Sequence, residues 1–291
     1  MRGWKTILAT IAVAILLSTS LGAAQHLGKL RAHSPRPVTQ VQQQAEHGDS
    51  NRLALVIGNS SYPDADAPLA QIAGDSDTLA SALRDDGFDV ELVRNATRHD
   101  MTRAIARLQA RLHPGSTVMI YFGGFGVQSR GDNYLIPVDA KIWTERDVRR
   151  EGINLEDVLS ELKDTGAKVR VAVVDASRRN PYERRFRSYS HGLAAIEADQ
   201  NELILTSDTA DHVVDETTGQ HSVLMTTLVN EMKSARPIAQ VFDSTRDAVA
   251  HITENRQVPA VSSALTGNVT LGPAAAGTRV SAREGLTDRP T

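Results

Sequence analysis

The chain has 291 residues, enough to bury a sizeable core in one or two domains, and its 41% hydrophobic and 23% charged residues are typical of globular proteins. A formal charge of −3 at pH 7, more negative still if a basic leader is removed, argues against a nucleic-acid-binding protein. The chain has no cysteine, which excludes disulfides, cysteine metal sites and any thiol nucleophile.

The N-terminal residues have the order of an export signal. Arg2 and Lys5 precede an apolar run from Ile7 to Leu17, and small residues follow as far as Ala24. This order predicts a signal peptide over residues 1–24, cleaved after Ala24, and therefore a periplasmic or secreted protein. The alternative is an uncleaved membrane tether formed by residues 7–24, because the apolar span nearly reaches membrane length.

Two segments flank a region of regular pattern. Residues 25–50 contain prolines and a glutamine-rich tract without apolar periodicity, which predicts a flexible linker. Residues 273–291, rich in Ala, Gly, Arg and Thr, predict a disordered tail. The region between them, residues 51–272, is predicted to form one domain.

Strand and helix patterns alternate through this domain. Short apolar runs predict buried strands at residues 53–57, 88–93, 118–122, 169–174 and 203–206. Helical spacing predicts helices at residues 69–83, 101–112, 154–166, 222–232 and 238–252. Strands that alternate with helices indicate a largely parallel sheet covered on both faces, so the predicted class is α/β.

Sites in such sheets form beyond the carboxyl ends of the strands. The first strand ends in Gly58-Asn59 and lacks the glycine fingerprint of a dinucleotide site, so no cofactor is predicted. The chain has no H-x-x-x-H or H-E-x-x-H spacing, so no metal site is predicted either. The third strand runs into Tyr121-Phe122-Gly123-Gly124-Phe125-Gly126-Val127-Gln128. The fourth runs into Val173-Val174-Asp175-Ala176-Ser177-Arg178-Arg179-Asn180-Pro181.

These two segments resemble the caspase-like peptidases, the clan of caspases, metacaspases and their bacterial relatives. Family members commonly read Y-F-S-G-H-G-x-Q after the third strand and D-A-C-R-x-N-P after the fourth, with the His as general base and the Cys as nucleophile. The resemblance runs from Arg52 to Leu271 and includes the segments 133–140 and 257–259. It implies a three-layer sandwich, with a mostly parallel sheet of about six strands and helices on both faces.

Both positions of the family's catalytic pair are replaced, by Phe125 and Ser177. Phe125 has no nitrogen to accept a proton, and a serine hydroxyl is far less acidic than a thiol. In a hydrolase that depends on such a pair, losing either member costs roughly six orders of magnitude in rate. We therefore expect a non-catalytic protein that binds a peptide or protein partner through the former substrate cleft.

Two alternatives stay open at this point. One is a weak serine hydrolase, in which His191, His212 or His221 approaches Ser177 from the loops after the fourth and fifth strands. The other is a structural module tethered at the membrane by the N-terminal segment. The sequence does not define the oligomeric state.

The resemblance also suggests what remains of the cleft. In relatives that cut after Arg or Lys, an acid two residues before the Cys lines the specificity pocket, and Asp175 matches it. Asp75 resembles a second acid of that pocket. The structural alternatives are an Asp175 that caps loop amides and an Asp75 that is solvated on a helix. Gly123, Gly124 and Gly126 match the loop on the oxyanion side, where close approach of a carbonyl favours glycine.

The most basic stretch of the chain, residues 178–187, contains five arginines with Tyr182 and Phe186 between them. Such a stretch can engage an acidic partner or a phosphate. Its alternative role is a solvated loop face.

Overall fold

The structure is a computed structural model that describes residues 51–63, 65, 68–182, 185, 192–214 and 219–272. The predicted signal peptide, linker and tail lie outside the described residues, as do His191, Arg184, Phe186 and Arg187. None of the helices in the described ranges is both long enough and apolar enough to cross a membrane.

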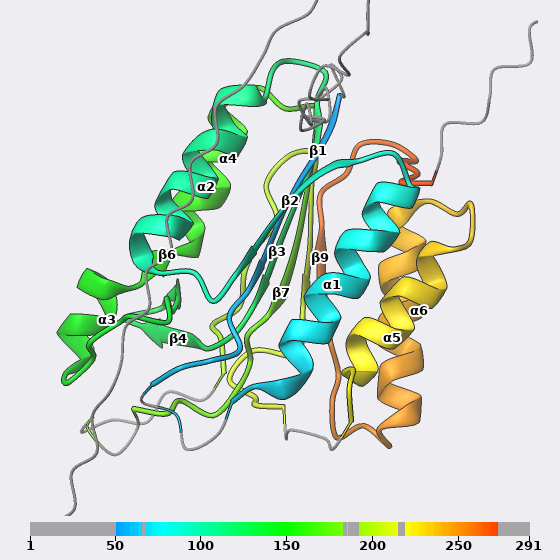
Figure 1. Cartoon of the computed structure of the whole chain (residues 1–291). Coiled ribbons are helices and arrows are strands. Elements are labelled where there is room, and N and C mark those ends of the chain that lie inside the picture. The colour runs from blue at the N-terminus through cyan, green and yellow to red at the C-terminus, as the bar shows by residue number, and fades with distance from the viewer. Residues whose placement is uncertain are drawn as a thin grey trace, which may run out of the picture. The chain divides into compact units, whose positions relative to one another are not determined.

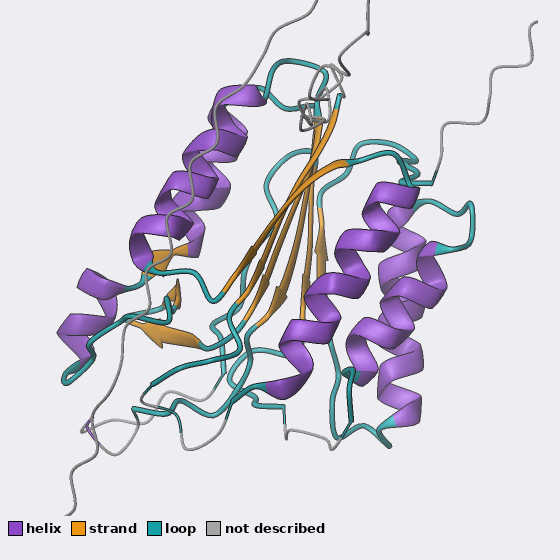
Figure 2. Cartoon of the chain, viewed as in Figure 1, coloured by secondary structure: helices purple, strands orange, loops and turns teal. Residues whose placement is uncertain are grey.

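A six-stranded sheet forms the centre of the domain, in the order β2-β1-β3-β7-β8-β9 (Figures 1 and 2). Its strands are β1 (Arg52–Gly58), β2 (Asp89–Arg94), β3 (Thr117–Gly123), β7 (Val169–Asp175), β8 (Glu202–Thr206) and β9 (Ala260–Ser263). The first five are parallel, and β9 pairs antiparallel with β8. The sheet therefore has the predicted number of strands and the predicted, mostly parallel, arrangement.

Helices cover both faces of the sheet, as Figure 1 shows. One face carries α1 (Ala70–Asp85), α5 (Val223–Met232) and α6 (Ile238–Ile252), and the other carries α2 (Arg98–Arg111) and α4 (Leu155–Asp164). Alternate residues of β1 serve the two faces, because successive side chains of a strand point to opposite sides. Leu53 and Leu55 join the core beneath α2 and α4, whereas Ala54 and Val56 join the core beneath α1, α5 and α6. The predicted three-layer α/β sandwich is confirmed.

The helix boundaries follow from local capping. Asn154 accepts a hydrogen bond from the Asp157 amide at the start of α4, as its position before an apolar face predicts. Thr97 and Asp100 form a capping box at the start of α2. Gly87, with φ of +81°, follows the end of α1.

A second, three-stranded sheet lies beside the main sheet and was not predicted. It contains β4 (Gly126–Ser129), β5 (Asp132–Leu135) and β6 (Ile153–Asn154), all antiparallel, with α3 (Glu145–Glu151) between the last two strands. Because β4 begins three residues after β3 ends, this small sheet fixes the loop that carries Phe125.

Candidate functional site

The carboxyl ends of β1, β3 and β7 meet at one edge of the main sheet. Gly58 pairs in register with Gly123, and Gly123 pairs with Asp175. The start of α1 packs closely against the same edge, since a Cβ on Gly58 would lie 2.0 Å from the Ser76 hydroxyl. The fold thus places Phe125, Ser177, Asp175 and Asp75 around one sheet edge, as the topology rule for open sheets predicts.

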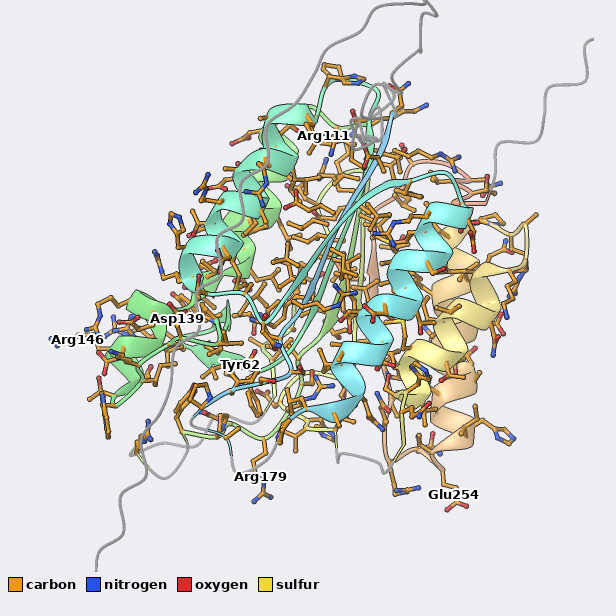
Figure 3. The ribbon with its side chains drawn as sticks, in the orientation of Figure 1. Tyr62, Arg111, Asp139, Arg146, Arg179 and Glu254 are labelled. Carbon is orange, nitrogen blue, oxygen red and sulfur yellow. The ribbon has the colours of Figure 1, made fainter. Side chains whose placement is uncertain are left out.

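Phe125, which the resemblance aligns with the family's general base, is buried in an apolar cluster. Its ring packs edge-on against Tyr62, with 4.8 Å between centroids, and the cluster also contains Ile142 and Tyr182. The Tyr62 hydroxyl accepts a hydrogen bond from the Phe125 amide at 3.1 Å and donates one to the Ile136 carbonyl at 2.9 Å. Figure 3 shows Tyr62 inside the fold, between the main sheet and the small one. The base position is therefore occupied by part of a packed core.

Ser177, which the resemblance aligns with the family's nucleophile, is completely buried. Its amide donates to the Ser207 hydroxyl at 3.1 Å, and its carbonyl accepts from the Val214 amide at 2.7 Å. Its hydroxyl oxygen has no hydrogen-bond partner among the described residues. This hydroxyl is therefore not hydrogen-bonded to any described histidine, the contact through which a general base would take its proton.

The backbone amides around the two positions are already engaged. The Gly124 amide donates to the Asp175 carbonyl at 3.2 Å, and the Gly126 amide donates to the Ala176 carbonyl at 3.0 Å. The amides of Phe125 and Ser177 donate to Tyr62 and Ser207, as described above. An oxyanion hole requires donors aimed at the developing charge, and these four amides are aimed elsewhere.

Close packing accounts for two of the loop glycines. A Cβ on Gly124 would lie 2.4 Å from the Tyr62 hydroxyl, and one on Gly126 would lie 2.6 Å from Leu193. Both distances are too short for any side chain, so glycine is needed here for packing alone. Gly123 meets the same restriction from the Tyr121 hydroxyl, at 2.4 Å.

Asp175 and Arg178 form a buried ion pair beside Ser177. One guanidinium nitrogen of Arg178 lies 3.1 Å from Asp175 Oδ1 and also donates to the carbonyls of Gly124 and Asp175. Asp175 Oδ2 and the side-chain amide nitrogen of Asn180 are buried without a hydrogen-bond partner among the described residues. Buried polar atoms are normally paired, so these atoms are available to a ligand that reaches them.

Asp75 is also fully buried, at the start of α1, rather than solvated. It accepts hydrogen bonds from the Ser222 amide at 3.2 Å and contacts His221 Nδ1 at 3.1 Å. Burial raises the pKa of its carboxyl, the hydrogen bonds from Ser222 partly offset that rise, and the negative charge of Asp175 adds to it. The pKa of the Tyr121 hydroxyl is also raised. Burial is the main cause, and the negative charges of Asp175 and Asp75 add to it.

Two of the three candidate bases lie in the described ranges. His221 is bound to Asp75, and its side chain is 41% exposed. The amide of His212 bonds the Thr209 carbonyl, and the His212 backbone packs against Gly192. His191 lies outside the described residues. Within the described ranges, no group of three or more His, Asp or Glu side chains is placed to hold a metal ion.

The arginine-rich stretch divides into inward and outward residues. Arg178 turns inward to Asp175, and Arg179 is exposed and extends away from the fold in Figure 3. Arg185 stacks on Trp143, 4.5 Å from its ring centroid, and donates to the Ile142 carbonyl. Sequence reasoning missed Tyr62 and Ser207 as partners of the two replaced positions, and only the proximity of Tyr62 to the end of the first strand hinted at its role.

Comparisons with known proteins agree with this architecture. The family described as the caspase domain matches residues 51–270. The mouse protein named mucosa-associated lymphoid tissue lymphoma translocation protein 1 homolog is 28% identical over 138 residues, and its human counterpart is 27% identical. Each match covers 46% of this chain and only 16% of the relative.

Solved structures show the same fold. Caspase-1 from Spodoptera frugiperda superposes with a TM-score of 0.57 at 16% identity, covering 78% of this chain and 92% of that one. The structure titled pro-sf-caspase-1 gives a TM-score of 0.55, again at 16% identity, covering 77% of this chain and 91% of its own. Since the family match spans about three quarters of the sequence, the chain belongs to the caspase-domain family, peptidase C14.

Proposed function

We propose that this protein is an exported caspase-domain pseudopeptidase that binds a peptide or protein partner through the former substrate cleft. One observation carries the proposal: within the described residues, Phe125 is packed into a core and the Ser177 hydroxyl is buried without a hydrogen-bonded base, while Asp175 Oδ2 and the Asn180 amide nitrogen have no partner. The two positions thus lack the side chains needed for catalysis, whereas polar atoms that could bind a partner remain beside them.

The charges of the cleft favour a basic side chain as the bound group. Asp75 and Asp175 supply two carboxylates, and the described cation buried with them is Arg178. A guanidinium or ammonium group from a partner could pair with Asp175 Oδ2 and displace the half-exposed His221 from Asp75. Both acids are buried in this conformation. Binding of such a group therefore requires a local rearrangement that exposes the two carboxylates.

Calorimetric titration tests this binding. Peptides with a central Arg, Lys or Asp would be titrated into the purified protein, and we expect the Arg and Lys peptides to bind and the Asp peptide to fail. Asp175→Asn should weaken binding about tenfold or more, which corresponds to roughly 1.4 kcal/mol. Asp77→Asn, an exposed carboxylate of α1 that makes an ion pair with Arg94 away from the cleft, is the control. Equal affinity of all three peptides would contradict the basic-residue pocket, and no binding at all would favour a structural module.

A turnover assay separates the pseudopeptidase from the serine hydrolase. The same peptides carrying a reporter, together with a serine-reactive phosphonate, should show neither cleavage nor labelling, because the Ser177 hydroxyl has no hydrogen-bonded base among the described residues. Cleavage or labelling that Ser177→Ala abolishes would establish the hydrolase instead.

Export is a separate part of the proposal and has its own test. Cell fractionation with sequencing of the mature N-terminus should find the protein outside the cytoplasm, beginning after Ala24. A full-length protein in the membrane fraction would support the tether formed by residues 7–24.

A further inference from the structure

A groove between α1 and α5 has no role in the site described above. Its volume is about 490 Å³, and residues of both helices line it. Acids of α1 form one wall, and apolar side chains form the floor. Its principal lining residues are Asp77, Asp85, Asp86, Ala82, Val229 and Met232.

The acidic wall is incompletely compensated. Asp77 pairs with Arg94, but Asp85 and Asp86 have no ion pair among the described residues. Burial, with Asp85 nearby, raises the pKa of Asp86 despite the opposing charge of Arg52. The lining cation, Lys233, is hydrogen-bonded to Asn230. The groove therefore presents two adjacent negative charges above an apolar floor.

The described chain ends beside this groove. Arg52 donates hydrogen bonds to the carbonyls of Leu271, Gly272 and Asp86, at 2.8, 2.9 and 3.0 Å. Leu271 is buried in the core beneath α1 and α5. Gly272, the last described residue, is thus held next to Asp86, which lines the groove.

The nineteen residues that follow have complementary chemistry. Residues 273–291 include Arg279, Arg283 and Arg289, two acids (Glu284 and Asp288), and Val280 and Leu286 among small residues, so three positive and two negative side chains leave a net charge of +1. Seven residues separate Gly272 from Arg279 and can extend about 23 Å, so this arginine can reach any part of the groove.

We propose that the C-terminal segment 273–291 docks in the α1–α5 groove of its own chain, with Arg279 and Arg283 against the acids of α1. The position of the uncompensated acids supports this occupant. Asp85 ends α1 and Asp86 follows it, and the Asp86 carbonyl shares the Arg52 guanidinium with the Gly272 carbonyl, so the segment leaves the fold beside these two acids. The docked segment would contact both α1 and α5. These helices are also linked by the hydrogen bond from the Ser222 amide to Asp75.

Disulfide trapping in the full chain tests the proposal, because the protein has no native cysteine to interfere. Ser81→Cys, in the groove, is combined with Val280→Cys in the tail. The comparison variant pairs Val280→Cys with Thr102→Cys, an exposed position of α2 on the opposite layer. We expect the groove pair to form an intramolecular disulfide about tenfold faster, as a raised effective concentration requires.

Charge reversal decides whether the acids hold the tail. Asp85→Lys with Asp86→Lys should reduce trapping to the rate of the comparison variant, and added salt should act in the same direction. Reversing Asp157 and Glu161 on α4 is the matched control and should leave trapping unchanged. Circular dichroism confirms that each variant is folded.

Three results would overturn the proposal. They are equal trapping of the two cysteine pairs, trapping insensitive to the reversal of Asp85 and Asp86, and disulfides that link two chains rather than closing one. The last result would assign the groove to a second copy.

Discussion

The ends of β3 and β7, which carry the two segments that resemble the family's catalytic motifs, differ in how their polar atoms are used. After β3, Phe125 packs against Tyr62, and the amides of Gly124, Phe125 and Gly126 are all engaged. After β7, Asp175 Oδ2, the Ser177 hydroxyl and the Asn180 amide nitrogen are buried with no partner among the described residues. One strand end is therefore closed by packing, whereas the other keeps polar groups that a ligand could satisfy.

The largest expected effect lies on the packed side. Phe125→Ala should lower the free energy of unfolding by about 3–5 kcal/mol, because it opens a cavity in a cluster that includes Tyr62 and Ile142. Urea denaturation measures it. Trp143→Ala, at a side chain that is 67% exposed, removes an aromatic residue without a comparable cavity and is the control. Similar losses for both variants would show that Phe125 is not a packing residue, and the contrast would fail.

A smaller effect is expected at Asp75, through pH. Its folded-state pKa is raised, so the native protein binds more protons than the unfolded chain from about pH 4 up to that pKa. Wild-type stability should therefore fall with rising pH across this window relative to Asp75→Asn. Denaturation at a series of pH values measures the difference.

The groups that face Asp75 define the controls for that measurement. They are His221 and Ser222, which precede α5, and Asp175 and Tyr121 from the main sheet. Repeating the series in a His221→Gln background removes the contacting imidazole. A parallel pH dependence of wild type and Asp75→Asn would mean that the carboxyl is not desolvated.

The smallest effect is expected at Ser177, and its sign is opposite. Ser177→Ala removes a buried hydroxyl that has no partner among the described residues, so it should be neutral or stabilising by up to about 1 kcal/mol. Ser207→Ala is the matched control, because its hydroxyl accepts from the Ser177 amide and its loss should destabilise. Destabilisation by Ser177→Ala would reveal a partner and weaken the contrast between the two strand ends.

The main elements could be predicted from the sequence because strong periodicity specifies them. The apolar run before Gly58 and the helical spacing from Leu69 to Leu83 each identify one element without tertiary information. Strands β4, β5 and β6 have two to four residues, too few to show a period, and they form only by pairing with one another. Strand β9 is similar, since Ala260–Ser263 becomes a strand through its contact with β8.

The site could be predicted in position but not in detail. The strand-end rule brings Asp175 and Phe125 to one edge from sequence order alone. The packing of Tyr62 on Phe125, and the burial of Asp75 under His221, depend on contacts across 63 and 146 residues. Such long-range contacts leave no local signal in the sequence.

Because the loop amides are already hydrogen-bonded, inhibitors that imitate a transition state should bind this protein differently from active peptidases. Peptide aldehydes and ketones gain affinity for peptidases by imitating the transition state, which requires donors for the oxygen and a reactive nucleophile. Here the amides of Gly124, Phe125 and Gly126 are bonded to the fold itself. A warhead should add nothing to the affinity of a peptide that binds, so reagents that detect peptidases by reactivity would overlook this protein, whereas unmodified peptides would find it.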